Sequence, residues 1–181
     1  VDRVGFGKSH SGYSIAYKKK HIPYLEKIIK ENNNAGKKIY VMGSSYGGPI
    51  AAALAMYNPE LVEELYLISP VINPASEKIF WFSYLGKLGF INWYIPPSLK
   101  VATDEKFAHR AQLRKLKPYW QNITAKTYVI MGEDDWIANP KSNLAFAQKQ
   151  LVNAREAEFI LLEKTGHTIV WQRPELIKNI L

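Results

Sequence analysis

Three residue types that together can cleave an acyl bond occur in this sequence in a defined order. Ser45 is the central residue of the segment GSSYG at 43–47, a G-x-S-x-G pattern. Carboxylates cluster at 133–135, and His167 follows a glycine near the end of the chain. A serine hydroxyl is a weak nucleophile at neutral pH, so a histidine must accept its proton and a buried carboxylate must orient that histidine. The order serine, acid, histidine therefore indicates nucleophilic catalysis.

The residues around Ser45 predict the strand, turn and helix that such a serine needs. Residues 39–42 (IYVM) are β-formers, and residues 51–56 (AAALAM) are strong helix formers. We expect a nucleophile elbow in which Gly43 and Gly47 are required because a Cβ at either would collide with the neighbouring backbone. The alternatives are an ordinary βα loop or a phosphate-binding glycine loop. No Lys-Ser/Thr pair follows as in a P-loop, and no G-x-G-x-x-G occurs at this position.

The candidate acid and base each follow a further β-rich run. Residues 126–131 lead into GEDD at 132–135, and residues 159–162 lead into EKTGH at 163–167. A histidine placed directly after a glycine, just beyond a strand, is free to project its ring over the edge of a sheet. Both groups are therefore expected at the strand ends where the serine also lies.

Four segments of the chain resemble segments of the α/β-hydrolase superfamily. They are DRVGFGKS at 2–9, GSSYGG at 43–48, GEDD at 132–135 and GH at 166–167. The first departs from the family pattern at Val4, where many members have proline. The resemblance extends over nearly the whole chain, and it implies a mostly parallel sheet flanked by helices, with a helical lid inserted into it.

The resemblance also implies roles for individual residues. Ser45 would be the nucleophile, His167 the base and Asp135 the acid. Asp134 is the rival acid, and its alternative role is that of a solvated or loop-capping carboxylate. The family pattern G-x-x-D, counted from the glycine of GEDD, favours Asp135.

One half of the oxyanion hole has a candidate, and the other half does not. The resemblance implies that the backbone amide of Tyr46 is one donor and that a loop of the H-G type after an early strand supplies the second. The sequence begins at Val1, in the segment that follows this strand in the family, and it contains no such loop before it. We expect that N-terminal strands are absent from this sequence, or that the domain lacks one oxyanion donor.

Strands alternate with helices along the chain except in one interval. We predict helices at 13–33, 46–57, 140–150 and from 174 onward, and strands at 39–42, 65–69, 126–131 and 159–162. This alternation predicts an α/β fold with a parallel sheet covered on both faces. We expect residues 1–70 and 126–181 to form the α/β-hydrolase core, incomplete at its N-terminus, and residues 71–125 to form a helical lid or cap insertion.

The insertion is rich in aromatic residues, which suggests an apolar roof over the serine. Of these we predict that four contact substrate: Trp81, Phe82, Trp93 and Tyr94. The alternative is that they only pack the lid against the sheet. Residues 79–95 carry a single charge and could resemble a membrane span, but the segment is only about 17 residues long and is interrupted by glycines. A pair of lid helices is the favoured interpretation.

Composition excludes some functions and leaves others open. The 181 residues contain no cysteine, so disulfides and thiolate metal sites are excluded. The net charge of +8 lies in scattered lysines and arginines outside any recognised nucleic-acid motif, so no nucleic-acid partner is expected. An anionic or amphipathic substrate would be attracted, and membrane-surface contact stays open. His10, His21 and His109 do not follow a strand end downstream of an acid loop, and each is expected to be a surface or packing residue. For His10 the alternative is a position near the rim of the site.

We therefore expect a serine hydrolase that cleaves an ester or related acyl bond of a small, partly apolar substrate, without a metal or organic cofactor. A carbon–carbon bond hydrolase, an acyltransferase and a peroxidase could use the same three residues. A non-catalytic binding module on the same fold is the alternative from another class. We expect a cytoplasmic location, with secretion not excluded, and no oligomeric state follows from the sequence.

Overall fold

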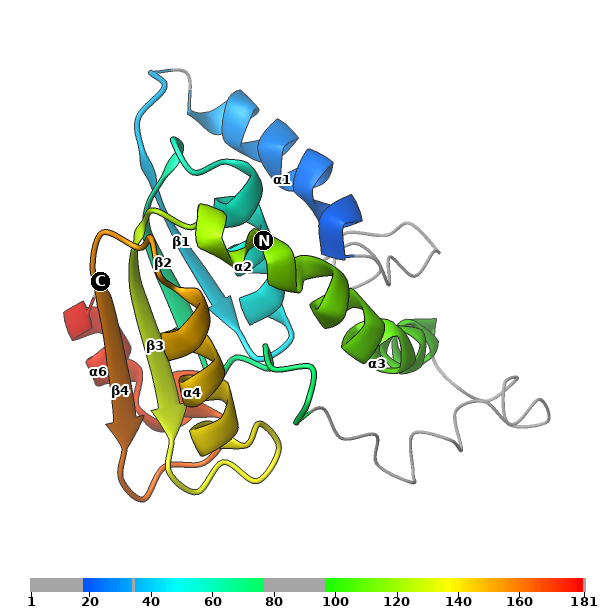
Figure 1. Ribbon diagram of the computed structural model, residues 1–181, viewed down its shortest axis with the longest axis vertical. Helices are drawn as coiled ribbons and strands as arrows, with labels where there is room; N and C mark the ends of the chain where they lie inside the picture. The colour runs from blue at the N-terminus through cyan, green and yellow to red at the C-terminus, as the bar shows by residue number, and fades with distance from the viewer. Residues whose placement is uncertain (1–17, 34, 77–96, 181) are drawn as a thin grey trace.

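The core of the molecule is a four-stranded parallel sheet (Figure 1). The computed structural model describes residues 18–33, 35–76 and 97–180. The strands are β1 (Ile39–Ser44), β2 (Val62–Ile68), β3 (Lys126–Gly132) and β4 (Ala157–Leu162). They lie side by side in the order β1-β2-β3-β4. Every neighbouring pair is parallel, which confirms the predicted fold class.

The register of the strands brings their carboxyl ends to one edge of the sheet. Ser44 pairs with Ile68, Ile68 pairs with Ile130, and Ile130 pairs with Ile160. The loops that follow β1, β2, β3 and β4 therefore all leave from this edge. In an open parallel sheet this is the edge at which ligands bind.

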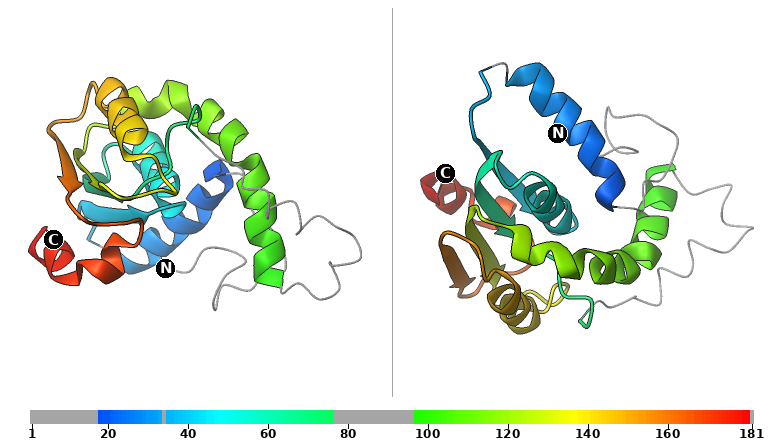
Figure 2. Two further views of the ribbon diagram at one scale, coloured as in Figure 1. Left: turned by 90° about the horizontal axis from the view of Figure 1, so that it is seen from below. Right: turned by 45° about the horizontal axis from the view of Figure 1, so that its top comes forward.

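Helices cover both faces of the sheet (Figure 2). The long helices are α1 (Lys18–Asn32), α2 (Gly47–Tyr57), α3 (Pro97–Leu116) and α4 (Pro140–Gln150). The short ones are a 3₁₀ helix η2 (Lys117–Asn122), α5 (Ile169–Gln172) and α6 (Pro174–Ile180). Helix α2 packs on β1 and β2, α4 packs on β3 and β4, and α1 packs on α2. Helices α5 and α6 lie on the opposite face.

Two hydrophobic cores match these two faces. The larger joins the fully buried Leu65, Leu67 and Val129 of the sheet to the alanine-rich α2 and to Trp120 of η2. Small side chains on α2 let its backbone approach the sheet closely. The smaller core joins Ile68 and Ile130 to Ile169 and Ile177. The central strands β2 and β3 thus alternate between two buried faces, as expected for a parallel sheet with helices on both sides.

The structure extends several of the predicted elements. Strand β2 begins at Val62 and β4 begins at Ala157, a few residues before the predicted starts. The additional residues include Glu63, Glu64 and Glu158, whose charges disfavour a buried strand, and Glu63 and Glu158 make ion pairs at the sheet edge. Strand β1 also runs two residues further than predicted, as far as Ser44.

The predicted insertion is described only in part. Helix α3 and η2 fall within the interval 71–125, which agrees with a helical insertion, whereas residues 77–96 lie outside the described residues. A function as a lid stays a prediction. Within the part of the chain that the structure describes, no helix has the length and apolar character required to cross a bilayer.

Candidate active site

Ser45 occupies a strained turn between β1 and α2. Its backbone φ is +52°, in the left-handed region that non-glycine residues rarely adopt. Its N–H donates to the carbonyl of Ile68 at 2.9 Å, so the turn is held against the end of β2. Tyr46 follows in a right-handed helical conformation as the N-cap of α2. The predicted strand, turn and helix around the serine are all present.

The glycines of this turn do not all behave as expected. A Cβ at Gly43 would lie 2.7 Å from the Cβ of Ala51 and would also collide with the carbonyl of Gly47, as predicted. A Cβ at Gly47 would meet nothing within 4 Å, so the expectation for this position is wrong. Gly47 is the first residue of α2, and a side chain there would enter open space. The second close approach is at Gly48, where a Cβ would lie 2.7 Å from the Cβ of Pro70.

The loops that follow β3 and β4 are joined to each other through their backbones. The N–H of Glu133 donates to the carbonyl of Leu162 at 2.9 Å, and the N–H of Asp134 donates to the carbonyl of Thr165 at 3.0 Å. A Cβ at Gly132 would lie only 2.5 Å from the carbonyl oxygen of Gly166. Glycine at this position lets the two loops approach closely, which fixes the spacing between the acid and the histidine.

Ser45, His167 and Asp135 form a continuous chain of hydrogen bonds. The Ser45 Oγ lies 2.7 Å from His167 Nε2, and His167 Nδ1 lies 2.8 Å from Asp135 Oδ2. The imidazole side chain is 13% exposed and the carboxylate is fully buried. A carboxylate that accepts from Nδ1–H leaves Nε2 as the acceptor for the serine hydroxyl. The arrangement can therefore remove the proton from Ser45.

The backbone holds the carboxylate of Asp135 in place. Its Oδ1 accepts hydrogen bonds from the N–H groups of Ile137 at 3.0 Å and Ala138 at 2.8 Å, which leaves Oδ2 for the histidine. Asp134, the rival candidate, has an exposed side chain, and its backbone N–H bonds to the histidine loop. The geometry thus gives Asp135 the contact with His167, in line with the count from Gly132.

The remaining candidates fall into two groups. The four predicted substrate contacts, Trp81, Phe82, Trp93 and Tyr94, lie outside the described residues, as does His10. His21 and His109 are buried, with 3% and 2% exposure, so neither is a surface residue. Among the described residues, no group of three or more His, Cys, Asp or Glu side chains is arranged to hold a metal ion.

Sequence reasoning missed the position of His109 beside the serine turn. Its ring centroid lies 4.9 Å from that of Tyr46, the residue after Ser45, at an interplanar angle of 57°. The only signal in the sequence is its spacing of four residues from Glu105 on a predicted helical segment, which places both on one helix face. Which face is buried depends on tertiary packing.

Comparisons with known proteins agree with this architecture. A family model described as alpha/beta hydrolase fold matches residues 1–88. A monoacylglycerol lipase from Paleococcus ferrophilus is 18% identical, with a TM-score of 0.71 over 99% of this chain and 79% of that chain. A thermophilic esterase from Thermogutta terrifontis, with malate bound, is 17% identical, with a TM-score of 0.68 over 99% of this chain and 76% of that one.

A peroxisomal α/β-hydrolase from Saccharomyces cerevisiae is also similar. It is 16% identical, with a TM-score of 0.70, and the match covers 99% of this chain but 65% of the yeast chain. Among curated proteins, no sequence matches this chain. Identities this low establish the fold and not the reaction. The parallel sheet, the serine turn, the family-model match and the structural neighbours together show that this chain has the α/β-hydrolase fold.

Proposed function

We propose that this protein is a serine hydrolase that cleaves an ester or related acyl bond of a small, partly apolar substrate. The observation that carries the proposal is the hydrogen-bonded chain from Ser45 Oγ through His167 to Asp135, with distances of 2.7 and 2.8 Å. A buried, doubly anchored carboxylate, an oriented imidazole and a serine on a strained turn form the set that acyl transfer requires.

The reaction follows from this geometry. Ser45 Oγ attacks the acyl carbonyl carbon while His167 Nε2 takes the hydroxyl proton, and Asp135 stabilises the resulting imidazolium. The histidine then gives the proton to the leaving alcohol, and a covalent acyl-serine remains. A water molecule, activated by the same imidazole, attacks this ester and releases the acid and the free serine. The backbone N–H of Tyr46 is the proposed donor to the oxyanion at each tetrahedral stage.

The neighbours support an acyl substrate. The printed names of two of them describe a monoacylglycerol lipase and an esterase. Within the described residues, α3 and η2 belong to the inserted interval, where the sequence predicts an apolar roof. A partly apolar acyl compound fits this combination better than a charged, fully polar one.

The proposal is tested by labelling with a fluorophosphonate probe, which reacts only with an activated serine. We expect one covalent adduct per chain, located at Ser45 by mass spectrometry of the digested protein. Ser45→Ala should abolish labelling and ester hydrolysis while the fold, followed by circular dichroism, is unchanged. Ser44→Ala is the matched control and should retain labelling. A protein that is folded but is not labelled at all would be a binding module rather than an enzyme.

The apolar part of the substrate is tested with a series of p-nitrophenyl esters from acetate to octanoate. Each buried methylene is worth about 0.8 kcal/mol, so kcat/KM should rise about fourfold per methylene until the pocket is filled. Trp81→Ala and Trp93→Ala should flatten this rise more than they slow acetate hydrolysis. If kcat/KM falls from acetate onward in the unmutated protein, the pocket is small and the predicted aromatic roof does not bind the acyl group.

A further inference from the structure

The buried face of α3 is polar in the middle of the helix and apolar toward its C-terminal end. Leu113 and Leu116 are almost fully buried toward the C-terminal end of the helix. One and two turns earlier on the same face are His109 and Glu105, each 2% exposed, and Gln112 beside them is 6% exposed. Buried polar groups have defined partners more often than exposed ones do, so the polar part of this face has a fixed place in the structure.

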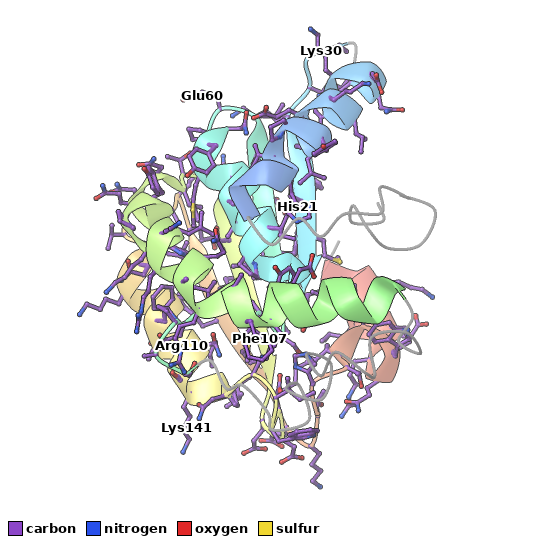
Figure 3. The ribbon with its side chains drawn as sticks, turned by 90° about the vertical axis from the view of Figure 1, so that its right-hand side faces the viewer. His21, Lys30, Glu60, Phe107, Arg110 and Lys141 are labelled. Atoms are coloured by element: carbon purple, nitrogen blue, oxygen red, sulfur yellow. The ribbon has the colours of Figure 1, made fainter. Side chains whose placement is uncertain are left out.

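The polar part of the face meets the serine turn. The ring of His109 contacts the ring of Tyr46, with centroids 4.9 Å apart. Tyr46 lies between Ser45, whose φ is +52°, and the first residue of α2. The end of α1 that carries the buried His21 lies close to α3 (Figure 3). Tyr46 is thus held through its side chain by a helix distant in sequence.

The position of Tyr46 matters because its backbone N–H is the proposed oxyanion donor. Such a donor must lie about 2.7 to 3.1 Å from the oxyanion, and its loss costs about a hundredfold or more in turnover. A misplacement of about 1 Å can cost a similar factor. Tyr46 follows a residue in a strained conformation, so a contact that fixes its side chain also restrains its amide.

We propose that His109 is a positioning residue for the oxyanion hole: its ring, packed on that of Tyr46, fixes the amide next to Ser45 and couples helix α3 to catalysis. This inference rests on the proposed hydrolase function and adds a residue to it. A residue that acts in this way should affect kcat rather than KM, because the oxyanion forms only in the transition state.

The test compares His109→Ala with His109→Phe, which keeps an aromatic ring, and with Arg110→Ala, an exposed neighbour on the same helix (Figure 3). Active sites are first titrated with the fluorophosphonate probe, so that only folded, reactive chains are counted. With p-nitrophenyl acetate, His109→Ala should lower kcat per titrated site about tenfold or more with little change in KM. His109→Phe should retain most of the activity, and Arg110→Ala should match the unmutated protein.

A double-mutant cycle identifies Tyr46 as the intermediary. Tyr46→Ala should lower kcat to a similar extent, and His109→Ala should add little in the Tyr46→Ala background. Additive losses would overturn the inference, as would an unchanged kcat in His109→Ala or a folded His109→Phe variant as slow as the alanine variant. If His109→Ala does not fold, His109→Gln replaces it under the same criteria. Absence of labelling in the unmutated protein would overturn the proposed function together with this inference, whereas normal labelling with unaffected His109 variants overturns the inference alone.

Discussion

The carboxyl ends and the amino ends of the strands, called here the carboxyl edge and the amino edge of the sheet, are stabilised by different kinds of interaction. At the carboxyl edge, Ser45 and Ser69 have positive φ angles, backbones approach at glycines, and a buried carboxylate orients a nearly buried imidazole. At the amino edge, Lys126 pairs with Glu156 and Glu158 at 3.0 and 3.4 Å, and Glu63 pairs with Lys38 and Arg155 at 3.1 and 2.7 Å, largely in water. Exposed ion pairs contribute little stability, whereas strain and buried polar contacts need a surrounding structure that enforces them.

This difference indicates where a single substitution should have a large effect. At the carboxyl edge the polar groups of Ser45, His167 and Asp135 have fixed partners, so the removal of one group leaves another misoriented. At the amino edge several exposed charges share partners, and solvent replaces whatever is removed. The contrast can be tested with one substitution for each kind of interaction.

The largest effect is expected at the buried carboxylate. Asp135→Asn should preserve the fold but disfavour the imidazole tautomer that accepts from Ser45, lowering kcat by about 10⁴-fold. The measurement is steady-state hydrolysis of p-nitrophenyl acetate. The control is Asp134→Asn, on the exposed neighbour, which should change kcat by no more than about twofold. The opposite ranking would transfer the role of acid to Asp134 and contradict the geometry.

An intermediate effect is expected at the elbow glycines, in stability rather than in chemistry. Gly43→Ala forces a Cβ against Ala51 and the Gly47 carbonyl, and overpacking of this kind costs about 1 to 3 kcal/mol of unfolding free energy. Gly47→Ala meets no atom and should be neutral or stabilising by up to about 1 kcal/mol at the start of a helix. Urea unfolding curves measure both. Equal losses would mean that both glycines of the pattern are sterically required after all.

The smallest effect is expected at the amino edge. Hydrogen bonds from Arg155 and Lys38 lower the pKa of Glu63 in the folded state. A lowered pKa adds stability that is fully present above the unfolded-state pKa of about 4.3 and is lost as the pH falls from there through the lower folded-state pKa. Glu63→Gln should therefore lower the melting temperature slightly at pH 7, and the difference from the unmutated protein should shrink as the pH falls below about 4.3, vanish below the folded-state pKa, and be smaller in high salt.

The control for this substitution is Glu60→Gln, at an exposed position nearby (Figure 3). It should leave the melting temperature unchanged at every pH. A loss at Glu63 as large as that at Gly43 would remove the contrast between the two edges.

Most features of the carboxyl edge could be predicted from short segments of the sequence. The GSSYG segment between a β-rich run and an alanine-rich run predicted the turn at Ser45, and the count from Gly132 selected Asp135 over Asp134. The turn and the contact of Asp135 with His167 agree with these expectations because strand ends and turns are encoded over a few residues, whereas the catalytic roles stay predictions. The requirement at Gly47 was predicted wrongly because the direction of a Cβ depends on where the helix packs.

What sequence could not supply depends on contacts between distant segments. The burial of His109 and its contact with Tyr46 depend on which face of α3 turns toward the sheet, and the charged sequence around His109 does not mark that face. The starts of β2 and β4 were placed too late because Glu63 and Glu158 disfavour a buried strand, whereas the structure pairs them with cations at an exposed edge. These ion pairs, which offset the charge of each glutamate, can be identified only when the neighbouring strands are aligned.

The order of the strands also has a consequence for how the chain acquires its reactivity. Ser45 and His167 are 122 residues apart, and β4, which precedes the histidine, is an edge strand of the described sheet and pairs there with β3. Parallel pairing between distant segments forms slowly, because the loop-closure entropy is lost before the contacts compensate for it. A chain that has folded only as far as β3 would thus hold a formed serine turn without its base. The reactivity of Ser45 would then appear only after β4 has paired with β3, and probe labelling during refolding would measure that step.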